Sequence, residues 1–254
     1  MELDLLSSLR RVLRDTESFR AVVDAVNSRT DAITLHGLAG SLNAFVLDAL
    51  RNGCDRQILV VTATTNTAEH LRDDLETLLG EQSVRYFPDW ELIPFEEKSP
   101  HVEVTALRLE VMQSLLIGEP VVVVAPVTAL LRPTLEPEAL AAASRIISVG
   151  DVLDLDELAK WLRSLSFEAS NQVVEMGQYA RRGGIIDIFT FGAEQPFRIE
   201  MFDDEVESIR SFDPATQRSV ESVTEIEVLP RREVLAGDSW WGAAKDRITK
   251  AEVE

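Results

Sequence analysis

Residues 35–46 read LHGLAGSLNAFV, and this stretch decides how the first half of the chain is interpreted. A short apolar segment leads into a glycine-containing turn, and residues at helical spacing follow. That order is the outline of a phosphate-binding loop, whose pattern is G-x-x-x-x-G-K-[ST]. Gly37 takes the first position, but Leu42, Asn43 and Ala44 stand where the second glycine, the lysine and the hydroxyl residue belong.

Each of these replacements removes one function of such a loop. A side chain at Leu42 obstructs the close approach of phosphates to the backbone, Asn43 brings no charge to them, and Ala44 has no oxygen for Mg²⁺. We therefore favour a plain strand-to-helix turn, with Gly37, Gly40 and an N-cap at Ser41, over a nucleotide site. We predict no catalytic residue, no cofactor and no metal in this chain.

Helices and strands alternate around this loop. Strand signals and helical spacing take turns, which is typical of an open parallel sheet with helices on both faces. The sequence thus predicts an α/β domain over residues 1–145, with a nucleotide-binding fold that has lost its nucleotide. The predicted strands are 32–36, 57–63, 84–87 and 121–125, and the predicted helices are 42–50, 67–79 and 105–117.

The pattern changes near residue 145. An amphipathic helix over 154–165 is followed by strand signals at short spacing with turn-like breaks, which is typical of a sheet-rich α+β domain. We place this domain at 146–232. Residues 233–254 begin a segment that we expect to return to the first domain and to be truncated, with an N-cap at Asp238 or Ser239 ahead of Trp240 and Trp241. The strand signals are 172–180, 183–189, 196–202, 205–212 and 225–229.

Composition limits the classes of function. The 254 residues include 25 Lys and Arg against 44 Asp and Glu, a net charge of −19, and one cysteine, Cys54. A single cysteine allows no disulfide within the chain. No apolar run is long enough to cross a bilayer and no signal peptide is visible, so we expect a soluble, cytoplasmic protein without membrane contact. The acidic surface disfavours non-specific DNA binding by this chain.

The strand 197–202 carries the strongest candidate for a binding surface. Alternation places Arg198 and Phe202 on one face, about 13 Å apart at ~3.3 Å per residue, and Arg182 adds another positive charge. Arginine and an aromatic residue are the usual composition of an interface hot spot. The alternative is a solvated surface on which Arg182 and Arg198 pair with the nearby acids, and from the pattern alone both interpretations stand. Those acids are Asp203, Asp204, Glu205 and Glu207.

A metal or catalytic site has weaker support. The acids at 203–205 fit a hairpin turn, Asp187 fits the middle of a strand, and nothing places Cys54 near a histidine. The histidines are scattered, at His36, His70 and His101.

Three stretches resemble the N-terminal module of the transcription-repair coupling factors, the Mfd family. They are GQYARRGGIIDIF (177–189), RIEMFDDEVESIRSFDPATQRS (198–219) and FPDWELIPFEEKSPH (87–101). The resemblance covers about residues 35–232. That module is itself similar to the damage-verifying protein UvrB. UvrB relatives keep an intact phosphate-binding loop and an inserted DNA-gripping hairpin, and this chain has neither the loop residues nor room for the hairpin.

The resemblance implies a fold and a role. The fold is a degenerate, RecA- or helicase-like nucleotide-binding domain followed by a UvrA-interaction domain. The role is a non-catalytic adaptor that recruits UvrA to RNA polymerase stalled at DNA damage in nucleotide excision repair. RNA polymerase and DNA are bound, and ATP and Mg²⁺ used, by other domains of the full-length relatives. The implied UvrA contacts are Arg182, Arg198 and Phe202, whose replacement we expect to leave stability almost unchanged. A UvrB-type ATP-dependent protein is the alternative.

Overall fold

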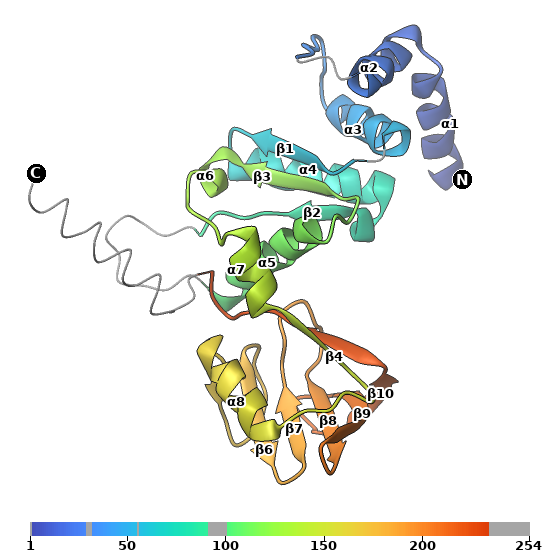
Figure 1. Ribbon diagram of the computed structural model, residues 1–254. Coiled ribbons are helices and arrows are strands. Elements are labelled where there is room, and N and C mark those ends of the chain that lie inside the picture. Colours follow the sequence, from blue (N-terminus) through green and yellow to red (C-terminus); the bar gives the residue numbers. More distant parts are fainter. Residues whose placement is uncertain (1, 29–31, 55, 91–100, 234–254) are drawn as a thin grey trace, which may run out of the picture. The chain divides into compact units, whose positions relative to one another are not determined.

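A computed structural model describes residues 2–28, 32–54, 56–90 and 101–233 (Figure 1). They form two compact units, one made of residues 1–98 and 111–133 and the other of 99–110 and 134–254. The predicted boundary at 145/146 stays a prediction. The expectations for 233–254, including Trp240 and Trp241, lie outside the described residues except for Glu233, as does most of the 87–101 stretch.

The first unit is built on a small parallel sheet. Strands β1 (Ile58–Thr62) and β2 (Val84–Tyr86) flank β3 (Val122–Pro126), in the order β1-β3-β2. Every residue of β3 is buried, as predicted for a central parallel strand. Its side chains alternate between two apolar clusters, Val122 and Val124 in one and Val123 and Ala125 in the other. Helices therefore cover both faces, which confirms that prediction.

Helices α3, α4, α5 and α6 supply these clusters. Helix α3 (Leu42–Gly53) and α4 (Thr65–Leu79) pack on the Val122 side, while α6 (Val127–Leu130) and residues of α5 (Val102–Leu116) pack on the other. Helix α5 begins at Val102, ahead of the predicted start. The 3₁₀ turn η1 (Glu81–Ser83) leads into β2.

Two further helices precede the sheet. These are α1 (Glu2–Arg14) and α2 (Glu17–Asn27). The Asp48 side chain of α3 is buried. It forms one ion pair with Arg10 and a second, 3.3 Å long, with Arg14. Burying a carboxylate is expensive unless it is paired, so these contacts fix α1 to α3.

The predicted strand at 32–36 was wrong. Residues 32–36 are exposed and form no strand, and among the described residues β1 pairs only with β3. The sequence favours an extended backbone there, but a strand also needs a neighbour for its N–H and C=O groups. Propensity cannot supply that neighbour.

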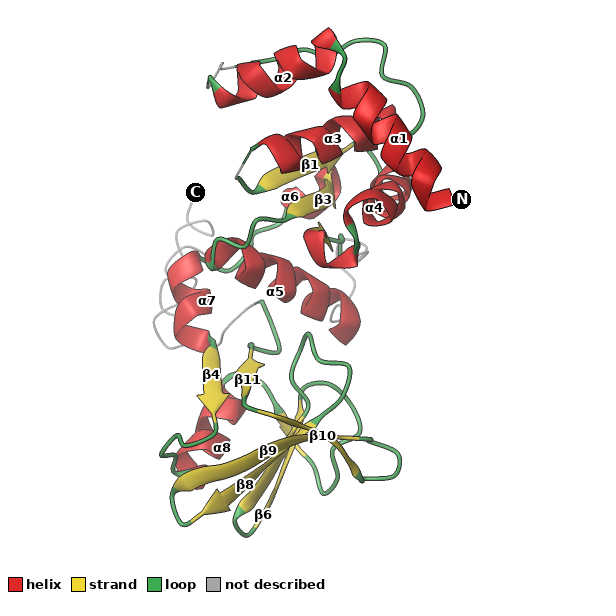
Figure 2. Cartoon of the chain, turned by 90° about the vertical axis from the view of Figure 1, so that its right-hand side faces the viewer, coloured by secondary structure: helices red, strands yellow, loops and turns green. Residues whose placement is uncertain are grey.

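The second unit contains a six-stranded sheet in the order β10-β9-β8-β7-β6-β5, seen as a twisted ribbon in Figure 2. All neighbours are antiparallel except β5 and β6. The strand predicted over 172–180 is confined to β6, because the Gln178 side chain accepts hydrogen bonds from the backbone of Val174 and Glu175 and holds them in a turn. The strands are β5 (Glu168–Ala169), β6 (Gln178–Arg182), β7 (Ile185–Ile188), β8 (Phe197–Phe202), β9 (Glu205–Phe212) and β10 (Ser219–Val223).

Helix α8 (Leu155–Ser164) covers one face of this sheet. Its Arg163 donates to the Tyr179 hydroxyl at 3.0 Å, and its Asp156 pairs with Arg181. A separate two-stranded sheet joins β4 (Arg145–Ser148) to β11 (Glu225–Val228) after α7 (Pro137–Ala143).

A buried ion pair joins two distant segments of the second unit. Arg108 of α5 and Glu233 are almost wholly buried and form two hydrogen bonds, of 2.5 and 3.0 Å. No helix among the described residues is long and apolar enough to span a membrane.

Candidate functional site

The strand register brings the predicted binding residues onto one face of the six-stranded sheet. Directly opposed residues of neighbouring strands point to the same side. Arg182 is opposite Ile185, and Ile185 is opposite Glu200. Glu200 lies two residues from both Arg198 and Phe202 on β8, so Arg198, Glu200 and Phe202 lie on the same side of the sheet as Arg182. We call this side the arginine face and define it by Arg182, Asp187, Arg198, Glu200, Phe202 and Arg210.

Arg182 carries an available positive charge. Its side chain is exposed, and its Nη2 donates to the backbone oxygen of Asn171 at 2.6 Å. Within the described part of the chain it forms no ion pair with a carboxylate. The alternative in which Arg182 pairs with the acids at 203–207 is therefore not what the structure shows.

Arg198 has a different environment, and its expected character as a free surface residue was wrong. Its Nε and Nη2 donate to the two carboxylate oxygens of Asp187 at 2.7 and 2.8 Å. The Asp187 side chain is only 2% exposed, and that of Arg198 is 19% exposed. The partner of Arg198 is thus a buried acid one strand away and none of the acids at 203–207, because β7 and β8 place the two residues directly opposite.

An aromatic ring and a raised pKa complete the Arg198 environment. The guanidinium lies over the Phe212 ring, 4.8 Å from its centre. The hydrogen bonds to the Asp187 carboxylate raise the pKa of Arg198 above its ordinary value, against the opposing effect of burial. Its charge is therefore permanent, and removing it would leave a buried carboxylate without a partner.

Phe202 is the exposed apolar residue of the arginine face. It is 73% exposed at the end of β8, opposite Glu205 of β9. The hairpin turn Asp203–Asp204 follows it, as predicted, and Asp203 has a φ of 58°, in the left-handed region that Asp tolerates. An aromatic ring held this far into solvent by a tight hairpin has little role in the fold.

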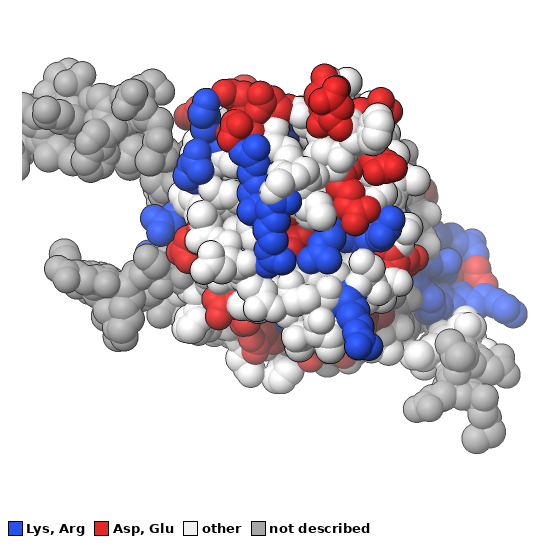
Figure 3. All heavy atoms as spheres, turned by 90° about the horizontal axis from the view of Figure 1, so that it is seen from below, with Lys and Arg blue, Asp and Glu red and all other residues white. Residues whose placement is uncertain are grey.

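One residue of the arginine face, Arg210, was missed from the sequence. Arg210 of β9 lies opposite Arg198 and pairs with Glu200 at 3.2 Å, and Glu200 also accepts a hydrogen bond from Ser208. Only the register between β8 and β9, which includes a bulge after Glu200, reveals this arrangement. In Figure 3, basic side chains gather in the middle of the visible surface with acidic side chains beside them.

The loop ahead of α3 has the geometry of a turn. Gly37 and Gly40 have φ of 80° and 57°, which glycine adopts without strain, and Ser41 is the N-cap of α3 although its side chain makes no capping bond. Ala44 is fully buried in the apolar cluster against α4, while Asn43 is exposed. The position that would offer Mg²⁺ a hydroxyl is thus part of the core.

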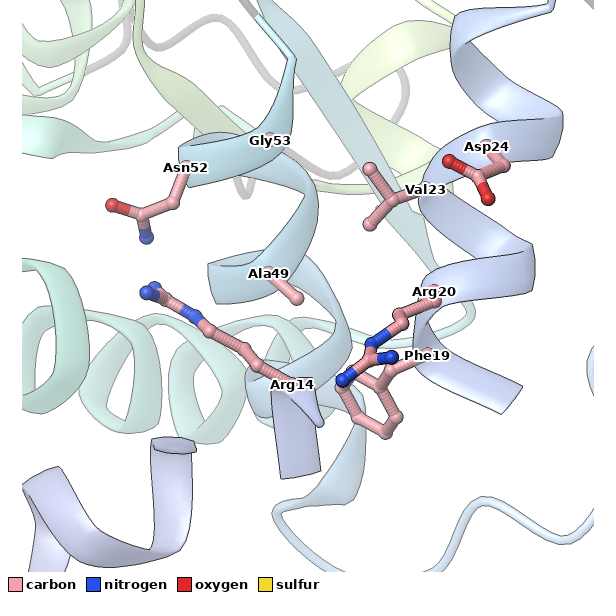
Figure 4. A pocket seen from close by; sticks show the side chains of 8 residues that line it. All are labelled: Arg14, Phe19, Arg20, Val23, Asp24, Ala49, Asn52 and Gly53. Carbon is pink, nitrogen blue, oxygen red and sulfur yellow. The ribbon is translucent and has the colours of Figure 1, made fainter. Parts of the chain in front are cut away.

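A pocket of about 290 Å³ lies between α1, α2 and α3. In Figure 4, Arg14 extends toward Asn52 and Arg20 lies beside Phe19. The charge of Arg14 is already directed to Asp48. Among the residues that the structure describes, no group of three or more His, Cys, Asp or Glu side chains could hold a metal ion.

Known proteins resemble this chain over most of its length. The model of the UvrB interaction domain matches residues 146–233, which contain the arginine face. The chain is 35% identical over 243 residues to the transcription-repair-coupling factor of Bacillus subtilis, covering 96% of this chain and 21% of that protein. It is 36% identical to that of Haemophilus influenzae over 180 residues, 71% of this chain and 16% of the relative.

A third relative shows the same relationship. The transcription-repair-coupling factor of Myxococcus xanthus is 32% identical over 233 residues, 89% of this chain and 19% of the relative. The chain thus spans about a fifth of the length of these relatives. This chain is therefore homologous to the N-terminal region of the transcription-repair-coupling factors and contains a UvrB interaction domain.

Proposed function

We propose that this chain is a non-catalytic adaptor module that binds UvrA through the arginine face. The observation that carries the proposal is that an exposed Phe202 lies on the same side of the sheet as Arg182, which has no carboxylate partner among the described residues, in a domain that matches the UvrB interaction domain. An exposed aromatic residue and a planar guanidinium fork are the groups that dominate protein interfaces.

Charge indicates the kind of surface that UvrA would present. The chain as a whole has a net charge of −19, whereas the residues that define the arginine face include three arginines and two carboxylates. Arg182 would pair with a carboxylate of UvrA, and Phe202 would enter an apolar depression. Complementary charge of this kind chiefly improves orientation and the rate of association.

The first unit is, in this proposal, a degenerate nucleotide-binding domain of the RecA or helicase type, kept as a scaffold. The burial of Ala44 and the exposure of Asn43 at the positions of the Mg²⁺ and phosphate ligands support this. In the whole protein, other domains would bind RNA polymerase and DNA and use ATP. This chain and those other domains together would recruit UvrA to stalled RNA polymerase. We favour a UvrB-type ATP-dependent function less, because Ala44 and Asn43 stand where that function needs the Mg²⁺ and phosphate ligands.

A titration of UvrA against the 254-residue chain tests the proposal. Phe202→Ala and Arg182→Ala should each weaken binding by roughly 2–4 kcal/mol if they are hot spots. Arg181→Ala is the matched control, because Arg181 is the neighbouring arginine on β6 but pairs with Asp156 on the α8 side. Full-strength binding by a Phe202→Ala, Arg182→Ala double variant would contradict the proposal.

A further inference from the structure

Asp187 is an unusual acid for the middle of a strand. It lies in β7, and its side chain is 2% exposed, so it has no direct access to a docking partner. A buried carboxylate needs hydrogen bonds and a counter-charge. Both come from Arg198, which offers two N–H groups to its two oxygens.

This two-point contact determines the orientation of the whole guanidinium. A single hydrogen bond would leave the group free to swing, whereas a bidentate contact fixes its plane. The Phe212 ring below it removes a second freedom. The remaining nitrogen, Nη1, makes no hydrogen bond within the described residues and is not fully buried, so it is the donor left for a partner.

We propose that Asp187 is a positioning residue for UvrA binding, which holds Arg198 with Nη1 directed outward from the arginine face without touching UvrA itself. This inference rests on the proposed function. An arginine loses much side-chain freedom when it docks, and Asp187 and Phe212 have already removed that freedom in the unbound chain.

Charge alone and positioning predict opposite effects of Asp187→Asn on the affinity for UvrA. Asp187→Asn removes one negative charge from the arginine face and should strengthen contact with an acidic partner if charge alone mattered. If positioning matters, the same change weakens binding, because the amide NH₂ faces guanidinium N–H groups and the fork is lost. We expect a loss of about three- to tenfold, the factor for immobilising one flexible side chain.

Asp156→Asn is the matched control. Asp156 is also an aspartate paired with an arginine, Arg181, but it lies on the α8 side of the sheet, so its replacement removes the same charge and leaves the contact between Asp187 and Arg198 intact. The affinity of this variant for UvrA should equal that of the unmodified chain.

A double-mutant cycle separates positioning from a merely structural role. In an Arg198→Ala background, Asp187→Asn should change UvrA affinity by less than about twofold, because no guanidinium remains to be held. The same second change should raise the melting temperature of the Arg198→Ala variant, since it removes a buried unpaired charge. Equal losses of affinity from Asp187→Asn in both backgrounds would overturn the proposal.

The free protein supplies an independent readout. The Arg198 Nε–H bonded to Asp187 should exchange slowly with water in ¹⁵N NMR spectra, and this protection should disappear in Asp187→Asn at a temperature where melts show both proteins folded. If the unmodified chain does not bind UvrA, the proposed function fails and this inference with it. If it binds and Asp187→Asn binds as tightly, only the inference fails.

Discussion

Arg182 and Arg198 carry the same charge on the same face, yet their contacts give them different roles in stability. The guanidinium of Arg182 contacts one backbone oxygen, whereas that of Arg198 neutralises a buried carboxylate. The sequence shows two arginines near a cluster of acids. It does not show that the relevant acid is Asp187, because the pairing depends on which residues of β7 and β8 are opposite.

Replacing each arginine by alanine should separate these roles. Arg198→Ala should lower the free energy of unfolding by roughly 3–5 kcal/mol, since Asp187 is left buried and unpaired. Arg182→Ala should change it by about 0.5 kcal/mol or less, as is usual at exposed positions. Urea unfolding of the two variants checks this. Equal stability of the two variants would contradict the description of the Arg198 environment.

At the scale of elements, the hairpin of β8 and β9 extends the arginine face beyond Phe202. Val152 forms an isolated bridge to Glu205, and Glu205 lies opposite Phe202, so the three residues make one row across the sheet. Val152 is 68% exposed and Phe202 is 73% exposed. A row with apolar side chains at both ends offers a wider contact than Phe202 alone.

Val152→Asp should therefore weaken UvrA binding by more than about 1 kcal/mol, the threshold for residues that matter in an interface. Ile146→Asp is the control, because Ile146 is similarly exposed, at 55%, but lies in β4 of the separate two-stranded sheet. Both variants should melt close to the unmodified chain. If the two titrations with UvrA give the same affinity, the row plays no special part.

The N-cap of helix α8 is a carboxylate, that of Asp154. The Asp154 carboxylate accepts hydrogen bonds from the backbone N–H of Glu157 and Asp156, which lower its pKa below the ordinary value of 3.8. A depressed folded pKa contributes stability that is present above the unfolded value and is lost as the pH falls through the folded one.

Asp154→Asn should keep a cap whose strength does not depend on this titration. The difference in melting temperature between the unmodified chain and the variant should be constant from pH 7 to about 5, and should shift against the unmodified chain as the pH falls below about 4. Thermal melts across this range measure it. A difference that stays constant down to pH 2 would show that the carboxylate is not responsible.

At the scale of the whole molecule, the first unit has a parallel sheet covered by helices on both faces, and Leu42, Asn43 and Ala44 stand at the positions of the phosphate-binding pattern in the loop ahead of α3. We expect no nucleotide to bind. Millimolar Mg-ATP should leave the melting temperature unchanged, whereas a ligand present at 100 times its Kd would stabilise the fold by ~2.7 kcal/mol. A clear thermal shift would contradict the interpretation of Leu42, Asn43 and Ala44 as a lost site.

The net charge of the molecule makes a second prediction. With a charge of −19, the isolated chain should bind duplex DNA weakly or not at all at physiological salt. A gel shift at micromolar protein tests this, with an unrelated polyanion as competitor. A shift that the polyanion does not abolish would show a dedicated DNA site.

The periodicity of the sequence was enough to predict most elements and the presence of a parallel sheet followed by a sheet-rich second part. The buried run of β3, the helices α3 and α4, and the hairpin at Asp203–Asp204 follow from local spacing and turn chemistry, which depend on neighbours in the chain. The shared side of Arg198 and Phe202 follows from alternation within one strand in the same way.

Tertiary structure alone decided which residues meet. The strand expected at 32–36 has no partner in the described sheet, and β10 was not expected at all. The contacts of Asp187 with Arg198, of Glu200 with Arg210 and of Arg108 with Glu233 join residues from different elements. Strand register and burial create these pairs, and neither is a property of a single segment. The sequence by itself therefore determined the candidate residues. The fold determined which of these residues are available to a partner.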